Sequence, residues 1–284
     1  MCYLVSPEEA MRVHSLHVYP IKGCQGIELT AMHIERLGPA LDRRLMVVDE
    51  QDRFLTQRTD PKLATVRVDL TDGSLTLSSP SVGRLFQIPL PYEPGGRYRD
   101  VKIWKDQVGA IDMGEEASLW FSRVLDQRVR LVRKVGRRAS RGVTLHGEQV
   151  ETSFADGYPI LLTSVESLAQ LNAWLLERGK DPVGMERFRP NIVLVGVDNP
   201  FDEESFGEIA VGEVRLMGVS RCARCPVVTT DQHTGDVALD DEPRATLREL
   251  HNFNGVGPAF GLNVDHLTVR RDGEREGHPI HHQV

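Results

Sequence analysis

The sequence has few cysteines, no long apolar run and no excess of basic residues. Its 284 residues include only 4 cysteines, too few for a disulfide framework in a chain of this length. The longest apolar runs, such as residues 192–197, are far shorter than the roughly 20 residues that a membrane helix needs. The start of the chain lacks the charged-then-apolar pattern of a secretory signal. We therefore expect a cytoplasmic protein with no membrane partner.

Acidic residues exceed basic ones by 41 to 34, which gives a formal charge of -7. This balance argues against a general nucleic-acid binder, which needs a broad excess of Lys and Arg. Apolar residues make up 40% of the chain, enough for a buried core in one large or two modest domains. A disordered chain is therefore excluded.

Short alternating segments predict strands at residues 14–18, 45–48, 66–70 and 75–77. Asp72-Gly73 joins the last two segments and predicts an antiparallel hairpin, because this pair readily adopts positive φ angles. Few segments have helical periodicity. The expected class is therefore α+β, mostly β.

Three helices are predicted from start signals and apolar stripes. Asp112 and Glu115 have capping-box spacing before the first helix, and Thr163 and Glu166 have it before the second, which should stop at Gly179. Asp241 would cap the third helix, over residues 243–251. The predicted buried faces are Ala117, Trp120, Phe121, Val124 and Leu125 in the first helix and Leu168, Leu171 and Leu175 in the second.

Residues 128–141 contain basic residues and no acidic one: Arg128, Arg130, Arg133, Lys134, Arg137, Arg138 and Arg141. The change in composition predicts a domain boundary. Either the segment is a docking face for an acidic redox partner or an anionic ligand, or it is a solvated linker strand. The polar residues 270–284 are predicted to form a mobile tail.

The sharpest motif is Cys222-Ala223-Arg224-Cys225. A structural zinc site would need four ligands, and only one such cysteine pair is present. A thioredoxin-like dithiol would lie at a helix start, whereas Pro226 and the β-branched residues 227–230 predict a strand. In a third interpretation one cysteine is a thiolate ligand to a soft metal, with Arg221 and Arg224 favouring the thiolate and holding an anionic cofactor. Two small buried side chains remain the plain structural alternative.

The motif and several other stretches together resemble the MOSC-domain family, in the branch of the mitochondrial amidoxime-reducing component and its bacterial relatives. The resemblance covers roughly residues 12 to 265. Its stretches are residues 19–22, 42–43, 56–58 with Pro61, 167–168 with 171–172, 188–193, 222–225 with Thr229, Asp231 and 234–235, and 260–261. Gly23 and Ala223 depart from the branch, which has serine at both positions.

The resemblance implies a β-rich MOSC N-terminal domain (residues 12–127), a basic linker (128–150), a MOSC β-barrel domain with a few flanking helices (151–268) and a tail (269–284). It also implies molybdenum cofactor, a molybdopterin whose dithiolene holds the metal. By the same resemblance Cys225 is the metal ligand and the catalytic position, and Cys222 is a neighbour. Binding of pyridoxal phosphate is kept as a further expectation.

The resemblance also implies cofactor-binding residues from distant parts of the chain. Those matched to the cofactor's anionic end are Lys22 and Arg43. Those matched to the pterin are Arg189 and Asn191, and those matched to further cofactor contacts or the metal pocket are Gly157, Tyr158, Arg224 and Asn263. Taken alone, the charged residues would be ordinary surface charges and Asn191 a strand-end cap.

The expected activity is reduction of N-hydroxylated compounds, such as amidoximes, hydroxylamines or N-hydroxylated bases, as a detoxification step. Electrons would come from a separate ferredoxin-like protein or flavin reductase, because the sequence has no flavin or dinucleotide fingerprint. Asp231 is either a proton relay or a turn cap. The alternative function is a non-catalytic carrier of the cofactor, or of sulfur on Cys225.

Overall fold

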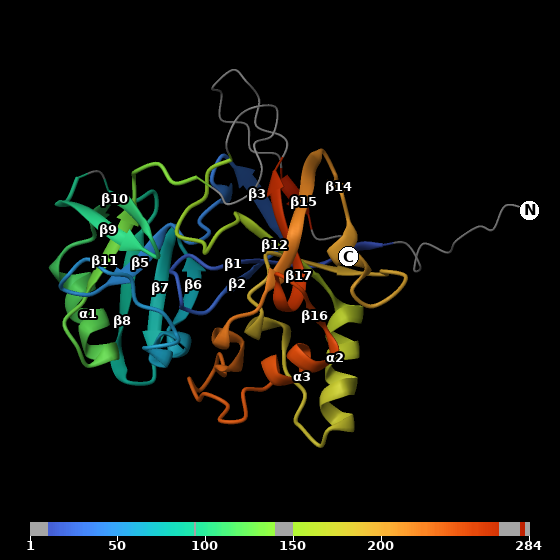
Figure 1. Ribbon diagram of the computed structural model, residues 1–284. Coiled ribbons are helices and arrows are strands. Elements are labelled where there is room, and N and C mark those ends of the chain that lie inside the picture. The colour runs from blue at the N-terminus through green and yellow to red at the C-terminus, as the bar shows by residue number, and fades with distance from the viewer. Residues whose placement is uncertain (1–10, 94, 140–149, 267–278, 282–284) are drawn as a thin grey trace, which may run out of the picture.

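The computed structural model describes residues 11–93, 95–139, 150–266 and 279–281. Within these ranges most regular structure is strand, arranged in several sheets with helices packed beside them (Figure 1). The helices are α1 (Glu115–Leu125), α2 (Val165–Glu177) and α3 (Arg244–Leu250), with 3₁₀ turns η1 (Pro61–Thr65), η2 (Met185–Arg187), η3 (Asp202–Ser205) and η4 (Pro226–Thr229). The predicted α+β, mostly β class is confirmed.

The largest sheet joins strands from both ends of the chain, in the order β14-β15-β17-β12-β13-β1-β2, with β16 beside β17. Its strands are β1 (Arg12–Val18), β2 (Ile27–Leu29), β12 (Ile160–Ser164), β13 (Ile192–Val195), β14 (Glu208–Val211), β15 (Val214–Ala223), β16 (Asn252–Phe253) and β17 (Gly257–His266). β1 runs antiparallel to β13, with Leu16 opposite Ile192. β1 and β2 therefore complete a sheet whose other strands all come from the second half of the chain.

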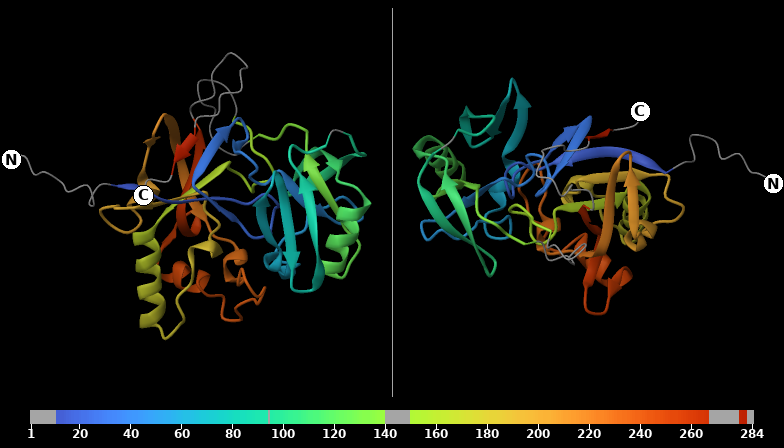
Figure 2. Two further views of the ribbon diagram at one scale, coloured as in Figure 1. Left: turned by 180° about the vertical axis from the view of Figure 1, so that it is seen from behind. Right: turned by 90° about the horizontal axis from the view of Figure 1, so that it is seen from above.

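Three smaller sheets complete the fold. One contains β5 (Leu45–Val48), β9 (Tyr98–Ile103), β10 (Asp106–Asp112) and β11 (Arg130–Lys134); another contains β6 (Arg67–Thr71), β7 (Ser74–Ser79) and β8 (Val82–Pro89). The last contains β3 (Ala31–Glu35), β4 (Gly38–Pro39) and β18 (Pro279–His281). We call residues 45–134 the N-terminal lobe, and the largest sheet with α2 and α3 the C-terminal lobe; Figure 2 shows the two lobes side by side.

Each lobe has its own apolar core. In the N-terminal lobe, Phe121 of α1 is fully buried with Leu63, Leu75 and Leu77. In the C-terminal lobe, Leu16 of β1 packs with residues of the later strands, including Leu162, Ile192 and Val264. The predicted apolar face of α1 is buried, as are Leu171 and Leu175 of α2, while Leu168 is partly buried.

The predicted hairpin is confirmed: β6 and β7 pair antiparallel, with Leu70 opposite Leu75. Asp72 and Gly73 have φ values of 48° and 72°, the left-handed pair that a two-residue hairpin turn requires. The strands predicted at residues 14–18 and 45–48 also form, as β1 and β5.

All three helices form, and α2 stops before Gly179, whose φ is 68°, as predicted, but the predicted N-caps are wrong. α1 starts after Gly114, and Asp112 instead accepts hydrogen bonds from the Gly114 N–H and from Arg99. α3 starts after Pro243; it is Glu242, not Asp241, whose carboxylate accepts from a first-turn N–H, that of Thr246. For α2 the N-cap is Ser164, one residue later than predicted.

The basic segment is not a solvated linker strand where it is described. β11 is an inner strand, between β5 and β10, and its Leu131 and Val132 are fully buried. Three arginines of the segment form ion pairs: Arg130 with Glu115, Arg137 with Glu151 and Arg138 with Asp106. Residues 140–149, including Arg141, lie outside the described residues.

The predicted mobile tail is corrected in part, since Pro279–His281 pair antiparallel with β3 and Ile280 is buried. The rest of that stretch lies outside the described residues. The predicted boundaries at residues 127 and 151 stay a prediction, although strands from both sides of them share the largest sheet.

Candidate cofactor site

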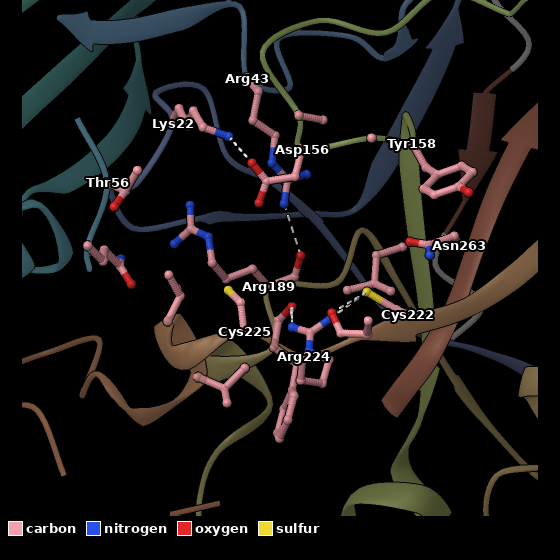
Figure 3. A pocket seen from close by; sticks show the side chains of 18 of the residues that line it. Lys22, Arg43, Thr56, Asp156, Tyr158, Arg189, Cys222, Arg224, Cys225 and Asn263 are labelled. Carbon is pink, nitrogen blue, oxygen red and sulfur yellow. Dashed lines mark hydrogen bonds and ion pairs between the residues drawn. The ribbon is translucent and has the colours of Figure 1, made fainter. Parts of the chain in front are cut away.

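A cavity of about 190 Å³ lies where the two lobes meet (Figure 3). Its walls come from the turn after β1, from the segments around residues 56–58 and 155–158, from η2 and its following turn, and from the end of β15. The structure brings all the predicted site residues to this cavity: Lys22, Arg43, Gly157, Tyr158, Arg189, Asn191, Arg224, Cys225 and Asn263.

Arg43 and Arg189 pack over the ring of Tyr19, with their guanidinium carbons 4.5 and 4.3 Å from its centre. The buried ring offers both cations a flat, electron-rich platform. Burial, reinforced by the charge of Arg43, lowers the pKa of Arg189 to about 10. Burial also raises the pKa of Tyr19 to about 12, so the platform stays neutral. Arg43 is ion-paired with Asp42 at 2.7 Å, and the charge of Arg189 beside it favours an anion in the cavity.

Both arginines have left-handed backbones, with φ of 47° at Arg43 and 57° at Arg189. Such φ values are uncommon for non-glycine residues and are typical of functional sites. The side chain of Asn191 helps to hold this geometry. Its Oδ1 accepts from Arg43 Nη1 at 3.1 Å and from the Leu161 N–H, while its Nδ2 donates to Asp42 and to the His17 carbonyl. Since its amide is fully engaged and buried, Asn191 acts here by positioning Arg43.

Lys22 extends toward Asp156, to which it donates at 2.6 Å, and toward the Phe154 carbonyl at 2.9 Å. Burial lowers the pKa of Lys22, and Asp156 opposes that shift. Trp104 Nε1 also donates to Asp156, at 3.0 Å, and Arg58 packs over the Trp104 ring. Partial desolvation opposes ionisation of Asp156, whose side chain is 59% exposed, but Lys22 and Trp104 hold its pKa well below the usual range. The N-terminal lobe thereby contributes Arg58 and Trp104 to the cavity wall.

The cysteine motif spans the end of β15, which stops at Ala223. Cys222 lies in the strand, and Arg224 Nη1 donates to its sulfur at 2.9 Å. Burial raises the pKa of the Cys222 thiol, against the opposing charge of Arg224. Cys225 is half-buried and follows the strand, and its side chain points into the space between Arg189 and Arg224 (Figure 3).

Two expectations for this motif are wrong. The strand predicted after Pro226 is the short 3₁₀ turn η4, with Cys225 as its N-cap residue. Arg221 does not line the cavity: it pairs with Glu204 at 3.1 Å and packs over Phe253. Arg224, by contrast, lines the cavity and is fixed by the Phe188 carbonyl, which accepts from its Nη2 at 2.6 Å.

Tyr158 and Asn263 line the cavity near Cys222, on the side away from Lys22 (Figure 3), and Gly157 also lines it. Asn263 Nδ2 donates to Ser220 Oγ and to the Arg221 carbonyl, each at 3.3 Å. This side carries fewer charges than the side formed by Lys22, Arg43 and Arg189.

Asp231 is a turn cap and does not line the cavity. Its Oδ1 accepts from the N–H groups of His233 and Thr234, both at 2.9 Å, and its Oδ2 accepts from Arg187. These backbone bonds, with Arg187, lower its pKa. The relay interpretation therefore has no support from its position.

Sequence reasoning gave no site role to Gln57, Arg58, Trp104, Asp156 or Arg187, all of which line the cavity. A signal existed for most of them. Gln57 and Arg58 fall in a stretch that carries the resemblance, Asp156 precedes Gly157, and Arg187 is two residues before Arg189. Trp104 had none, because only the tertiary fold brings the β9–β10 turn to the cavity.

The cavity fits an anionic, thiolate-bound group. Arg189 Nη2 and Arg224 Nε are buried and have no hydrogen-bond partner among the described residues. A buried unpaired guanidinium nitrogen is costly, so an acceptor in the cavity would stabilise both groups. The sulfur of Cys225 supplies a soft ligand beside them. In the described part of the chain no three His, Cys, Asp or Glu side chains cluster in a way that would hold a metal ion.

Among the described residues, no helix combines the length and apolar character needed to cross a membrane. The compartment in which the protein acts stays a prediction.

Comparison with known proteins shows two family domains along the chain. Residues 10–128 match the MOSC N-terminal beta barrel domain, and residues 149–277 match the MOSC domain. Mitochondrial amidoxime reducing component 2 of Macaca fascicularis is 30% identical over 293 residues, covering 96% of this chain and 83% of that protein. Mitochondrial amidoxime-reducing component 1 of Mus musculus is 33% identical over 289 residues, covering 95% and 81%. Molybdenum cofactor sulfurase of Oryza sativa subsp. japonica is 27% identical over 281 residues, covering 94% of this chain but 34% of that protein. The chain therefore belongs to the MOSC-domain family, with a MOSC N-terminal beta barrel domain ahead of the MOSC domain.

Proposed function

We propose that this protein binds molybdenum cofactor through Cys225 and reduces N-hydroxylated compounds with electrons from a separate donor protein. The observation that carries the proposal is the position of Cys225, whose sulfur lies in one cavity with Lys22, Arg43, Arg189 and Arg224. Relatives named as amidoxime reducing components match over nearly the whole chain, which supports the same activity.

In this proposal the residues divide by chemistry. Cys225 is the thiolate ligand to the metal, and Lys22 and Arg43 bind the phosphate, as the resemblance implies. The resemblance matches Arg189 to the pterin, but Arg189 shares the ring of Tyr19 with Arg43. We therefore assign Arg189 to the phosphate as well, for which its guanidinium offers a forked pair of donors. Arg224, Gly157, Tyr158 and Asn263 contact the pterin or line the space beside the metal. When bound, the cofactor supplies a two-electron redox centre that removes oxygen from nitrogen.

The net reaction consumes two electrons and two protons for each N–O bond cleaved, and it releases water and the corresponding amine or amidine. The chain's own residues bind and orient the reactants, while a ferredoxin-like or flavin-containing protein supplies the electrons. Arg130, Arg137 and Arg138 of the basic segment are engaged in ion pairs, so docking of this donor on the segment stays a prediction.

The test is a paired measurement on protein from a host with intact cofactor synthesis: molybdenum per chain, and reduction of an aromatic amidoxime by an artificial donor. Cys225→Ser removes the thiolate ligand itself. Loss of a residue that only supports a metal ligand commonly costs about 10–100-fold, so we expect turnover to fall at least about 100-fold. Cys222→Ser is the matched control, because it makes the same substitution at the other cysteine of the motif. This variant is expected to keep most of the molybdenum.

Equal damage from the two serine variants would instead indicate a metal-free dithiol, and zinc in place of molybdenum would contradict the proposal. The second candidate is a carrier of cofactor or sulfur, which the match to a molybdenum cofactor sulfurase favours. A carrier would bind molybdenum cofactor yet reduce no amidoxime.

A further inference from the structure

One buried amide pair crosses between the lobes beside the cavity. Gln232, after η4, and Gln57, after β5, exchange two hydrogen bonds, of 2.9 and 3.0 Å. Both side chains are almost fully buried, with 3% and 2% of their surface exposed. The amide pair therefore has one fixed arrangement, because rotating either amide would oppose donor to donor.

The same amide holds Arg189. Gln232 Oε1 also accepts from Arg189 Nη1 at 3.2 Å, and its Nε2 donates to the Thr230 carbonyl at 3.0 Å. Every polar atom of the Gln232 side chain is thus engaged, while Arg189 Nη2 has no partner among the described residues. One end of the guanidinium is fixed and the other is left for a ligand.

A dedicated turn presents Gln232 to this position. Asp231 caps the turn through the N–H groups of His233 and Thr234. Gly235, with φ of 78°, lies so close to η1 that an added Cβ would be 3.2 Å from the Pro61 carbonyl oxygen. Gln25 Nε2 anchors the turn further by donating to the Gln232 carbonyl at 2.8 Å. The turn is therefore docked on the N-terminal half of the chain.

The other side of the amide pair reaches the lysine of the site. Gln57 Nε2 donates to the carbonyl of Gly23, the residue after Lys22, at 2.7 Å. One hydrogen-bonded chain thus joins the backbone beside Lys22 to the guanidinium of Arg189, with Gln57 and Gln232 between them.

We infer that Gln232, bridged to Gln57, is a positioning residue that orients Arg189 toward the phosphate of a ligand bound in the cavity. Free arginine side chains lose considerable rotamer entropy when they bind, and a guanidinium already held at one end loses less. The inference deepens the proposed function, on which it rests for the identity of the ligand. Asp231, Thr234 and Gly235, which follow the cysteine motif, form the turn that presents Gln232 to Arg189.

The test uses full-length protein from a host without cofactor synthesis and measures binding of inorganic phosphate by calorimetry. Gln232→Leu removes one hydrogen bond to a charged group, so we expect phosphate affinity to fall about tenfold. Gln127→Leu is the control: it makes the same substitution at a glutamine that donates to Asp60 and does not line the cavity, so its phosphate affinity should stay within about twofold.

A double-mutant cycle separates positioning from general damage. Arg189→Lys keeps the cation but lacks the guanidinium fork, so in that background Gln232→Leu should change phosphate affinity less than about twofold. If Gln232→Leu does not fold, Gln232→Asn replaces it, because its amide is one methylene shorter but still polar.

Unchanged phosphate affinity in the folded Gln232 variant would overturn the inference, as would an equal loss in the Arg189→Lys background. Failure of the unmodified protein to bind phosphate would overturn it too. These readings need no molybdenum, so the proposed reduction and this inference fail separately.

Discussion

At the scale of single residues, the site depends on two left-handed arginines, Arg43 and Arg189, whose guanidinium groups pack on the ring of Tyr19. The resemblance assigned Arg43 and Arg189, but nothing in the sequence showed that both adopt positive φ or share the ring of Tyr19. Left-handed arginines cannot be predicted from propensity, which disfavours them. Gln232 was missed for a related reason. The role of a buried glutamine depends on its hydrogen-bond partners, and the sequence does not show which residues these are.

Gly26 offers a test of the Tyr19 platform, because a Cβ there would lie 2.5 Å from a ring carbon of Tyr19. The buried ring must then move, and with it Arg43 and Arg189. We expect Gly26→Ala to destabilise the protein by about 1–3 kcal/mol, as overpacking commonly does, and to weaken phosphate binding. Urea unfolding and calorimetry measure the two effects.

Gly83 provides the control for this substitution, since no atom lies within 4 Å of a Cβ added there. Gly83→Ala should leave both quantities unchanged. Normal phosphate affinity in Gly26→Ala would mean that the position of the ring does not govern the arginines.

At the scale of elements, the sequence predicted which segments are helices and strands better than it predicted where they begin. The apolar stripes of α1 and α2 and the Asp72-Gly73 turn are local signals, and the structure confirms them. Caps are not purely local, because tertiary partners compete for the same side chains. Glu166, the predicted capping-box acid of α2, instead accepts from the Gly196 N–H.

Ser164 is the N-cap of α2. Its Oγ accepts from the Ser167 N–H at 3.1 Å and donates to Glu203 at 3.0 Å. Glu203 is fully buried and also accepts from Ser167 Oγ, so the cap is part of a buried polar network. Ser164→Ala should therefore lower the free energy of unfolding by about 1–2 kcal/mol.

Thr163→Val is the comparison, since the sequence had placed the cap at Thr163. The hydroxyl of Thr163 contacts only the weak acceptor Met185 Sδ among the bonds described, at 3.3 Å. Denaturant unfolding should show a smaller loss for Thr163→Val than for Ser164→Ala. The reverse order would restore the cap that the sequence predicted.

At the scale of the whole molecule, the two lobes are interdependent in both fold and site. The sequence indicated two successive domains, because composition and family resemblance both vary along the chain. Neither can show that β1 crosses over to lie between β13 and β2. When a sheet is built from segments far apart in the sequence, the order of its strands depends on long-range pairing. Local periodicity in the sequence carries no information about such pairing.

A fragment of residues 150–284 tests this interdependence. Without β1, β13 loses its antiparallel partner and becomes an exposed edge, and the C-terminal core loses Val13, Leu16 and Val18. Burying each such side chain is worth about 1.5–3 kcal/mol, and a domain of this size has only about 5–15 kcal/mol of stability in total.

We expect the fragment to show no cooperative transition in urea by circular dichroism, and coexpression with residues 1–139 to restore one. The restored pair should also recover phosphate binding, because Lys22, Arg43 and Gln57 return with the first segment. If the fragment alone unfolds cooperatively, β1 is a peripheral strand, and the coupling between lobes is confined to the cavity.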